Sequence, residues 1–99
     1  MGDASWPFDE PPDVAAFTVR QVIEEGEPIL LVSHDEPDGA WQFISARRPA
    51  EDDARIVALR EIWRRDPTVG DLVDLPLGWV AWRQDPGQPW QRSRRSKES

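Results

Sequence analysis

Two runs of residues typical of β-strands lie on either side of a short polar segment near the middle of the chain. The runs cover residues 28–34 and 40–45, and in the second run Trp41 and Phe43 fall on the same face of the strand. The segment between the runs has the residues of a type I turn followed by a left-handed position: Pro37, Asp38 and Gly39. This pattern predicts a β-hairpin with a bulged turn.

The pattern before the hairpin predicts a short strand and then a short helix. Residues 14–17 are apolar, and they are followed by Thr18, a residue type that caps helices well. Apolar residues then recur at helical spacing at positions 19, 22 and 23, and Gly26 ends the pattern. We therefore expect a strand over 14–17 and a helix over 19–25, with a buried stripe made of Val19, Val22 and Ile23.

Residues 54–65 fit two patterns. One is a continuous helix, because apolar residues lie at helical spacing at positions 56, 59, 62 and 63. The other is a strand that runs directly into a helix, because the sequence Arg-Ile-Val-Ala over 55–58 is typical of a strand. We favour the second interpretation, with a strand over 55–58 and a helix that begins at Leu59.

Two further elements follow. Asp66 is suited to cap a short helix that has Pro67 at its first position and ends near Val73. Residues 78–84 then predict a last strand, with bulky side chains on both faces. Such a strand either lies inside a sheet that is covered on both sides or leaves Trp82 exposed.

Both ends of the chain differ in composition from the middle. Residues 1–13 are rich in proline and aspartate, which predicts an extended or disordered arm, and residues 91–99 predict a disordered basic tail. A single domain over 14–90 remains. Its elements predict an α+β fold, with an antiparallel sheet of four to five short strands and two or three short helices against one face.

Composition narrows the classes of function. The 99 residues contain no cysteine and one histidine, which excludes disulfides and cysteine-based metal sites. No apolar run approaches the roughly 20 residues of a membrane span, and the first residues lack a signal-peptide pattern, so we expect a cytoplasmic protein that does not bind membranes. Residues 1–40 carry ten acidic groups and one basic group, a net charge of −9, whereas residues 41–99 carry +2. This asymmetry disfavours nucleic acid and favours a basic protein as partner.

The predicted turn gathers the one histidine with three carboxylates. Ser33, His34 and Asp35 include the residue types of a hydrolytic triad, but neighbours on a strand point to opposite faces. A calcium loop centred on Gly39 also fails, because its final glutamate position falls on Ser45. We assign no catalytic residue, metal ligand or cofactor. An open alternative is a small-ligand or metal-assisted enzyme that uses His34, Asp35, Glu36 and Asp38.

Tryptophan is unusually abundant for such a small domain. Most of the six tryptophans are expected in the core, but tryptophan and arginine are also typical anchors of protein interfaces. Acidic groups beside such anchors favour a basic partner. The predicted partner-binding residues are the acids of the turn together with aromatic and arginine residues: Asp35, Glu36, Asp38, Trp41, Trp82, Arg83 and Trp90.

Three segments carry a resemblance to known proteins: VSHDEPDGAWQF, ALREIWRRDPTVGDLVDLPLGWVAWR and the closing PW. They resemble a group of small uncharacterised bacterial proteins with an S-H-D-x-D-G-x-W-Q-F hairpin. The chain is more distantly similar to immunity proteins of bacterial polymorphic toxin systems, which carry a comparable D-S-G-W-R-F hairpin. The resemblance covers about residues 18–90. It implies an α+β fold and a toxin as partner, and it supplies no catalytic residues.

The sequence therefore predicts a non-enzymatic protein-binding domain, with an immunity-type inhibitor of a basic toxin as the specific form. Two alternatives stay open. One is the enzyme centred on His34, and the other is a homodimeric accessory protein that associates through Trp82 and Trp90.

Overall fold

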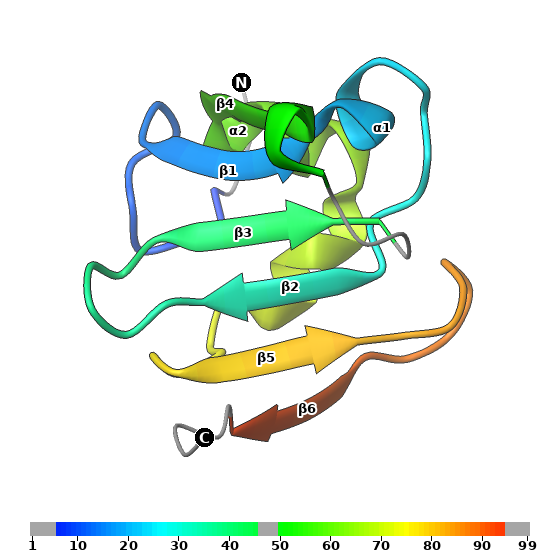
Figure 1. Cartoon of the computed structure of the whole chain (residues 1–99). Helices are drawn as coiled ribbons and strands as arrows, with labels where there is room; N and C mark the ends of the chain where they lie inside the picture. Colours follow the sequence, from blue (N-terminus) through cyan, green and yellow to red (C-terminus); the bar gives the residue numbers. More distant parts are fainter. Residues whose placement is uncertain (1–5, 46–49, 95–99) are drawn as a thin grey trace.

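The computed structural model describes residues 6–45 and 50–94 (Figure 1). They form a single α+β domain built on one six-stranded sheet with the order β4-β1-β3-β2-β5-β6. The strands are β1 (Ala15–Val19), β2 (Leu31–His34), β3 (Trp41–Ile44), β4 (Ala54–Ala58), β5 (Trp79–Trp82) and β6 (Gln91–Arg94). The helical elements are α1 (Arg20–Ile23), α2 (Leu59–Arg65) and the 3-10 helices η1 (Glu51–Asp53) and η2 (Pro67–Leu72).

The sheet differs from the predicted one in strand number and direction. It has six strands instead of four to five, and it is mixed, because β1 pairs with β3 in parallel while the other neighbours are antiparallel. The extra strand is β6, which pairs with β5 over Gln91–Arg94, inside the segment predicted as a disordered tail. All four residues of β6 are polar, and backbone hydrogen bonds to β5 hold the strand in the sheet. The sequence therefore shows no apolar pattern that would predict this strand. Residues 95–99 of that tail lie outside the described residues.

The hairpin forms where the sequence predicts it. Leu31 to His34 pair with Ile44 to Trp41, and the loop closes through a hydrogen bond from the Asp35 amide to the Ala40 carbonyl. Gly39 has a φ of 72°, the left-handed conformation expected at this position. Its amide donates to the carbonyl oxygen of Asp35 at 2.8 Å.

The segment around Thr18 is a strand and not a helix cap. β1 extends to Val19, and the Thr18 hydroxyl donates to the Phe43 carbonyl of β3 at 2.6 Å. α1 is only four residues long, and Val19 precedes it with an extended backbone and no side-chain cap. The predicted helix over 19–25 was therefore too long, because the hydroxyl that could cap a helix binds the neighbouring strand.

The interpretation of residues 54–65 as a strand followed by a helix is confirmed. β4 ends at Ala58 and α2 begins at Leu59. The first amides of α2 donate to carbonyls just before β1, Leu59 to Val14 and Arg60 to Pro12. Asp66 caps η2 by accepting from the Thr68 amide, as predicted.

Among the described residues, α2 and η2 cover only one face of the sheet, and Figure 1 shows them behind the strands. The strand side chains that point toward them alternate with side chains that point to the other face. This arrangement makes one hydrophobic core, to which the arm contributes as well. Its main members are Phe8, Val32, Trp41, Phe43, Leu59, Ile62, Val69, Leu72, Leu75 and Ala81.

The described part of the N-terminal arm lies across the domain. Phe8 is buried and meets Trp41 edge to face, while Trp6 meets Trp63 edge to face with ring centroids 5.5 Å apart. The indole nitrogen of Trp6 also donates to the Glu10 carbonyl. Residues 1–5 of the predicted arm lie outside the described residues.

Candidate functional site

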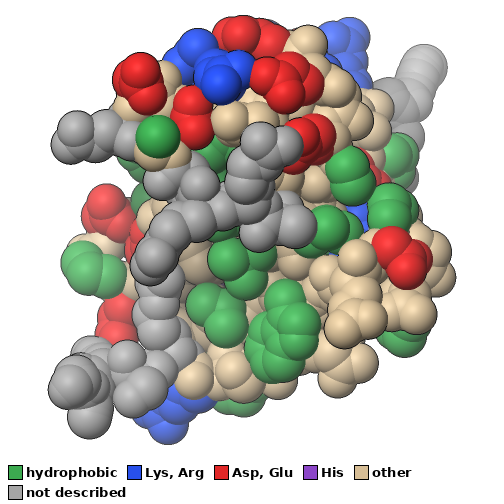
Figure 2. Space-filling view, turned by 45° about the vertical axis from the view of Figure 1, so that its right-hand side comes forward, with side chains coloured by type: hydrophobic (Ala, Val, Ile, Leu, Met, Phe, Trp, Pro, Cys, Tyr) green, Lys and Arg blue, Asp and Glu red, His purple; other side chains and the backbone are tan. Residues whose placement is uncertain are grey.

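The face of the sheet that is turned away from α2 and η2 carries a row of apolar side chains. We call it the open face and define it by Phe17, Leu31, Ile44, Ile56, Val80 and Trp82. Strand register makes the row continuous, because Phe17 lies opposite Ile56 and Leu31 lies opposite both Ile44 and Trp82. Figure 2 shows hydrophobic side chains gathered in the middle of the visible surface.

Three of these side chains are substantially exposed. Ile56 is 64% exposed, Trp82 39% and Phe17 38%. Single exposed apolar residues are ordinary, but neighbours on one sheet face form a patch, and such patches mark interaction sites. The open face is therefore the strongest candidate for a binding surface among the described residues.

A hollow of about 420 Å³ lies on the open face beside the hairpin. Phe17, Val19 and Ile44 supply its apolar walls, and Asp35 and Asp38 lie at its hairpin end. The remaining lining residues are small or neutral: Thr18, Ala40, Gln42, Ala50 and Ala54. The described part of its lining thus combines apolar surface with two carboxylates.

Hydrogen bonds orient both carboxylates. Asp35 accepts from the Ser33 hydroxyl at 3.2 Å and from the Gln42 amide group at 2.6 Å. Asp38 accepts from the Ala40 amide at 3.1 Å. These bonds hold the acidic end of the hollow against the end of the apolar row.

A second set of polar contacts stabilises the opposite end of the hollow. Asp53 accepts from the Ala50 amide at 3.0 Å, from Gln21 at 3.1 Å and from the Arg20 guanidinium at 2.9 Å. The hydrogen bond from Ala50, followed by the one from Gln21, lowers the pKa of Asp53 below 3.8. The pKa of Arg20 is raised, mainly by its hydrogen bond to Asp53. Asp53 thereby joins η1 to α1 beside the lining residues Ala50 and Ala54.

The seven predicted partner-binding residues do not lie on one surface. Asp35, Asp38 and Trp82 lie on or beside the open face. The Glu36 side chain lies against Gly78, where a Cβ atom would come within 3.3 Å of its Oε1. The other three residues, Trp41, Arg83 and Trp90, lie on the helical side of the sheet.

Trp41 is buried in the core and holds the arm in place. Its ring packs between Phe8 and His34, with the His34 ring centroid 3.9 Å away and nearly parallel. Its indole nitrogen donates to Glu10 Oε2 at 3.0 Å. At 2% exposure it supplies almost no surface to a partner.

Arg83 is buried and ties β5 to the helical layer. Its guanidinium donates to the Ile29 carbonyl at 2.9 Å and to Asp66 Oδ2 at 2.7 Å, and it also bonds Thr68 and the Pro86 carbonyl. The Trp90 ring lies over the guanidinium, 4.1 Å from its carbon. Arg83 and Trp90 therefore form an internal contact, while Trp82 lies on the opposite face of the sheet.

His34 is engaged by protein groups on the helical side. Its Nδ1 lies 2.7 Å from the Leu75 carbonyl oxygen, and its Nε2 lies 3.8 Å from Glu10 Oε2. The hydroxyl of Ser33 is bonded to Asp35 and points to the other face, so the triad geometry is not formed. No three histidine or acidic side chains among the described residues are grouped to hold a metal ion.

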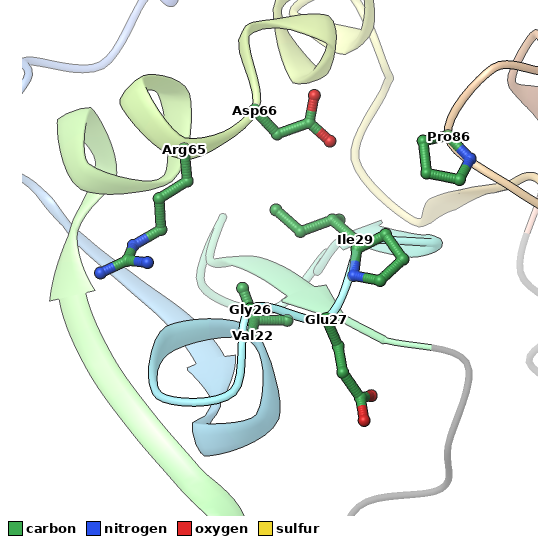
Figure 3. Close-up of a pocket in the computed structure, with 8 residues that line it drawn as sticks. Val22, Gly26, Glu27, Ile29, Arg65, Asp66 and Pro86 are labelled. Carbon is green, nitrogen blue, oxygen red and sulfur yellow. The ribbon is translucent and has the colours of Figure 1, made fainter.

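Another hollow, of about 520 Å³, lies at the end of the helical side (Figure 3). Gly26 and Ile29 come from the connection between α1 and β2, and Arg65 and Asp66 from the end of α2. Figure 3 shows Arg65 and Glu27 extending from different sides of the space. Asp66 already binds Arg83 and Thr68, so the hollow has mixed charge and does not favour one class of ligand.

Phe17 and Ile56 are not among the site residues predicted from the sequence. Both are large apolar side chains on the exposed face of their strands. The next residue in each strand points into the interior: Thr18 follows Phe17, and Val57 follows Ile56. Apolar positions on both faces of a strand were the available signal. That signal does not say which face the helices cover.

The comparisons with known proteins found no match: no protein-family model, curated protein or solved structure matches the chain. Within residues 6–45 and 50–94, no helix has the length and apolar character needed to cross a bilayer.

Proposed function

We propose that this chain is a non-enzymatic protein-binding domain that binds a basic partner protein through its open face. The observation that supports this proposal is the apolar row of the open face, which runs up to the acidic hairpin. Phe17 and Ile44 of the row line the same hollow as Asp35 and Asp38. An apolar centre with charged groups at its rim is the usual composition of a protein interface.

The apolar row supplies the burial that drives association. Ile56, Trp82 and Phe17 each expose a third or more of their surface, and a partner that covers them removes apolar area from water. Tryptophan is one of the residue types enriched among the anchors of protein interfaces. Trp82 therefore takes the anchor role that the sequence predicted for it.

Charge sets the class of partner. The chain has a net charge of −7, and ten of its acidic groups lie in residues 1–40, which include β2 and the hairpin turn. A basic protein is attracted by this field, which raises the rate of encounter and orients the approach toward the hairpin.

The specific form that we propose is an immunity-type inhibitor of a basic toxin. The support for it is the resemblance of Gly39-Ala40-Trp41-Gln42-Phe43 to the hairpin of immunity proteins. A small acidic domain with an exposed apolar face is suited to bind a basic toxin. Opposite charge attracts the toxin, and burial of the apolar face stabilises the complex.

The proposal is tested by protection of cells. A toxin encoded beside this gene is expressed with the wild-type chain, with the Ile56→Asp variant and with the Leu77→Asp variant. Leu77 is 51% exposed but lies in the turn before β5, so it is a matched control outside the open face. We expect wild type and Leu77→Asp to protect and Ile56→Asp to fail. Absence of such a toxin gene, or equal protection by both variants, would contradict the proposal.

Self-association through the same face is the competing outcome. Sedimentation of the isolated chain over a range of concentrations distinguishes the two. A concentration-dependent dimer that Ile56→Asp converts to monomer would identify a second copy as the occupant and would contradict the proposed partner.

A further inference from the structure

We infer that the partner protein adds an extended strand to the free edge of β4, so that the sheet continues into the partner. This inference rests on the proposed function, and it names the kind of partner segment that binds. β4 is an outermost strand of the sheet, and its central residue, Ile56, belongs to the open face. A partner that covers the side chain of Ile56 therefore also reaches the backbone edge beside it.

The strand register shows which backbone groups of β4 point to the free edge. In an antiparallel pair of strands, residue pairs that exchange hydrogen bonds alternate with pairs that do not. The Leu59 amide donates to the Val14 carbonyl at 2.8 Å, so these two residues are a bonded pair. Two positions along the register, Val57 and Ala16 are the next bonded pair. The amide and the carbonyl of Ile56 consequently point away from β1, toward the free edge.

Ala58 repeats this arrangement two positions further along β4. It lies opposite Ala15, between two bonded pairs, so its amide also points to the free edge. In the part of the chain that the structure describes, the amides of Ile56 and Ala58 have no hydrogen-bond acceptor. Backbone groups that recur at every second residue are the groups to which an added strand binds.

β4 has few of the features that prevent pairing at sheet edges, which are charged side chains, proline and bulges. It contains no proline and pairs with β1 over all five residues without a bulge. Its one charged side chain, Arg55, binds Glu24 at 3.1 Å. Ile56 is β-branched and 64% exposed. The other edge strand, β6, carries arginine at two of its four positions, so β4 is the edge better suited to accept a strand.

The side chains of β4 set the chemistry of the added strand. Successive side chains of a strand point to opposite faces, so one residue of the partner strand lies beside Ile56 on the open face. An apolar side chain there lengthens the apolar row and buries Ile56. The partner segment is therefore an extended stretch without proline, with an apolar residue at the position opposite Ile56.

Amide hydrogen exchange tests the added strand. The nitrogen-15-labelled chain is measured by nuclear magnetic resonance, alone and with the toxin encoded beside this gene, inactivated by substitution. We expect the exchange of the Ile56 and Ala58 amides to slow at least tenfold in the complex. Their proton signals should move downfield, because new hydrogen bonds form. The Arg92 amide of β6, on the other edge of the sheet, is the internal control and should exchange at the same rate in both states.

A proline variant separates backbone pairing from side-chain contact. Ala58→Pro removes one outward amide, and the φ of −69° at Ala58 is a value that proline adopts. The bonds between β4 and β1 and the side chain of Ile56 are unchanged. We expect binding of the toxin to weaken by roughly two- to tenfold, the effect of one lost hydrogen bond. Ala58→Ser keeps the amide and is the matched control, which should bind as wild type does. Dispersed amide signals establish that both variants are folded.

The outcomes distinguish this inference from the proposed function. If the toxin binds and shifts the Trp82 indole signal, but the Ile56 and Ala58 amides exchange as in the free chain, the inference is overturned and the proposed function stands. Equal binding by Ala58→Pro and Ala58→Ser would also overturn the inference. Slow exchange of the Ile56 amide in the free chain that is lost on dilution would identify a second copy as the occupant of the edge. If the toxin does not bind, both the inference and the proposed function are wrong.

Discussion

His34 and Trp41 stack across the β2–β3 pair with their ring centroids 3.9 Å apart and an angle of 10° between the rings. Both rings also face Glu10 of the arm, whose Oε2 lies 3.0 Å from the indole nitrogen and 3.8 Å from His34 Nε2. The one histidine of the chain therefore belongs to the contact that holds the N-terminal arm on the sheet. This arrangement gives His34 a structural role in the proposed account.

Removal of the Glu10 side chain should loosen the arm. Glu10→Ala leaves the partly buried indole N–H of Trp41 without its acceptor, and we expect the free energy of unfolding to fall by about 1–3 kcal/mol. Glu10→Gln keeps an acceptor oxygen and should cost less. Chemical denaturation of both variants measures the difference. If Glu10→Ala were as stable as wild type, the contact would not contribute to folding.

The Arg83 contact should be among the most sensitive in the domain. Arg83→Ala removes a guanidinium that is 2% exposed and leaves the Asp66 carboxylate and the Ile29 carbonyl without this donor. Loss of one partner of a buried ion pair costs about 3–5 kcal/mol. Arg83→Lys keeps the charge but not the planar group, so its cost should lie between that of Arg83→Ala and zero. Urea denaturation monitored by tryptophan fluorescence is the measurement. A cost below that of an exposed control, Arg64→Ala, would contradict the role assigned to Arg83.

Acid should weaken the domain in part through Asp53. The pKa of Asp53 is lowered in the folded chain from 3.8, mainly by the Ala50 amide, so its carboxylate stabilises the fold above that value. This contribution is lost as the pH falls through the folded-state pKa. The free energy of unfolding measured from about pH 6 to about pH 2 should fall more steeply for wild type than for Asp53→Asn. Parallel curves would mean that Asp53 has the same pKa in both states.

Gly39 should be required for the turn. Its φ of 72° disfavours side chains, and we expect Gly39→Ala to cost about 1–2 kcal/mol. Gly87→Ala is the matched control, because a Cβ there meets only ordinary contact, at 3.7 Å from Asp85. Thermal unfolding of the two variants gives the comparison. Equal melting temperatures would show that the turn tolerates a side chain.

The local elements could be predicted from the sequence because their signals are local. The turn residues Pro37, Asp38 and Gly39 and the change of periodicity at Leu59 act over a few positions, and the predicted hairpin and the β4–α2 boundary are both present. The exposure of Trp82 was one of two predicted outcomes for β5.

The remaining features depend on partners that are distant in the sequence. Thr18 binds the carbonyl of Phe43, 25 residues away, and Arg83 binds that of Ile29, 54 residues away. The polar strand β6 forms because β5 offers an edge for pairing, which its own residues do not indicate. For the same reason, the prediction from the sequence placed Trp41, Arg83 and Trp90 on one binding surface with Trp82. In the structure Trp82 lies on the open face, and the other three residues lie on the helical side of the sheet.

The most direct test of the open face is the side-chain signal of Trp82 in a two-dimensional nitrogen–hydrogen spectrum. The six indole groups can be assigned by substitution and followed while the proposed toxin partner is added. We expect the Trp82 signal to shift or broaden most, while the signals of Trp41 and Trp63 on the helical side change little. Changes concentrated at Trp63 or Trp90, with Trp82 unaffected, would contradict the account.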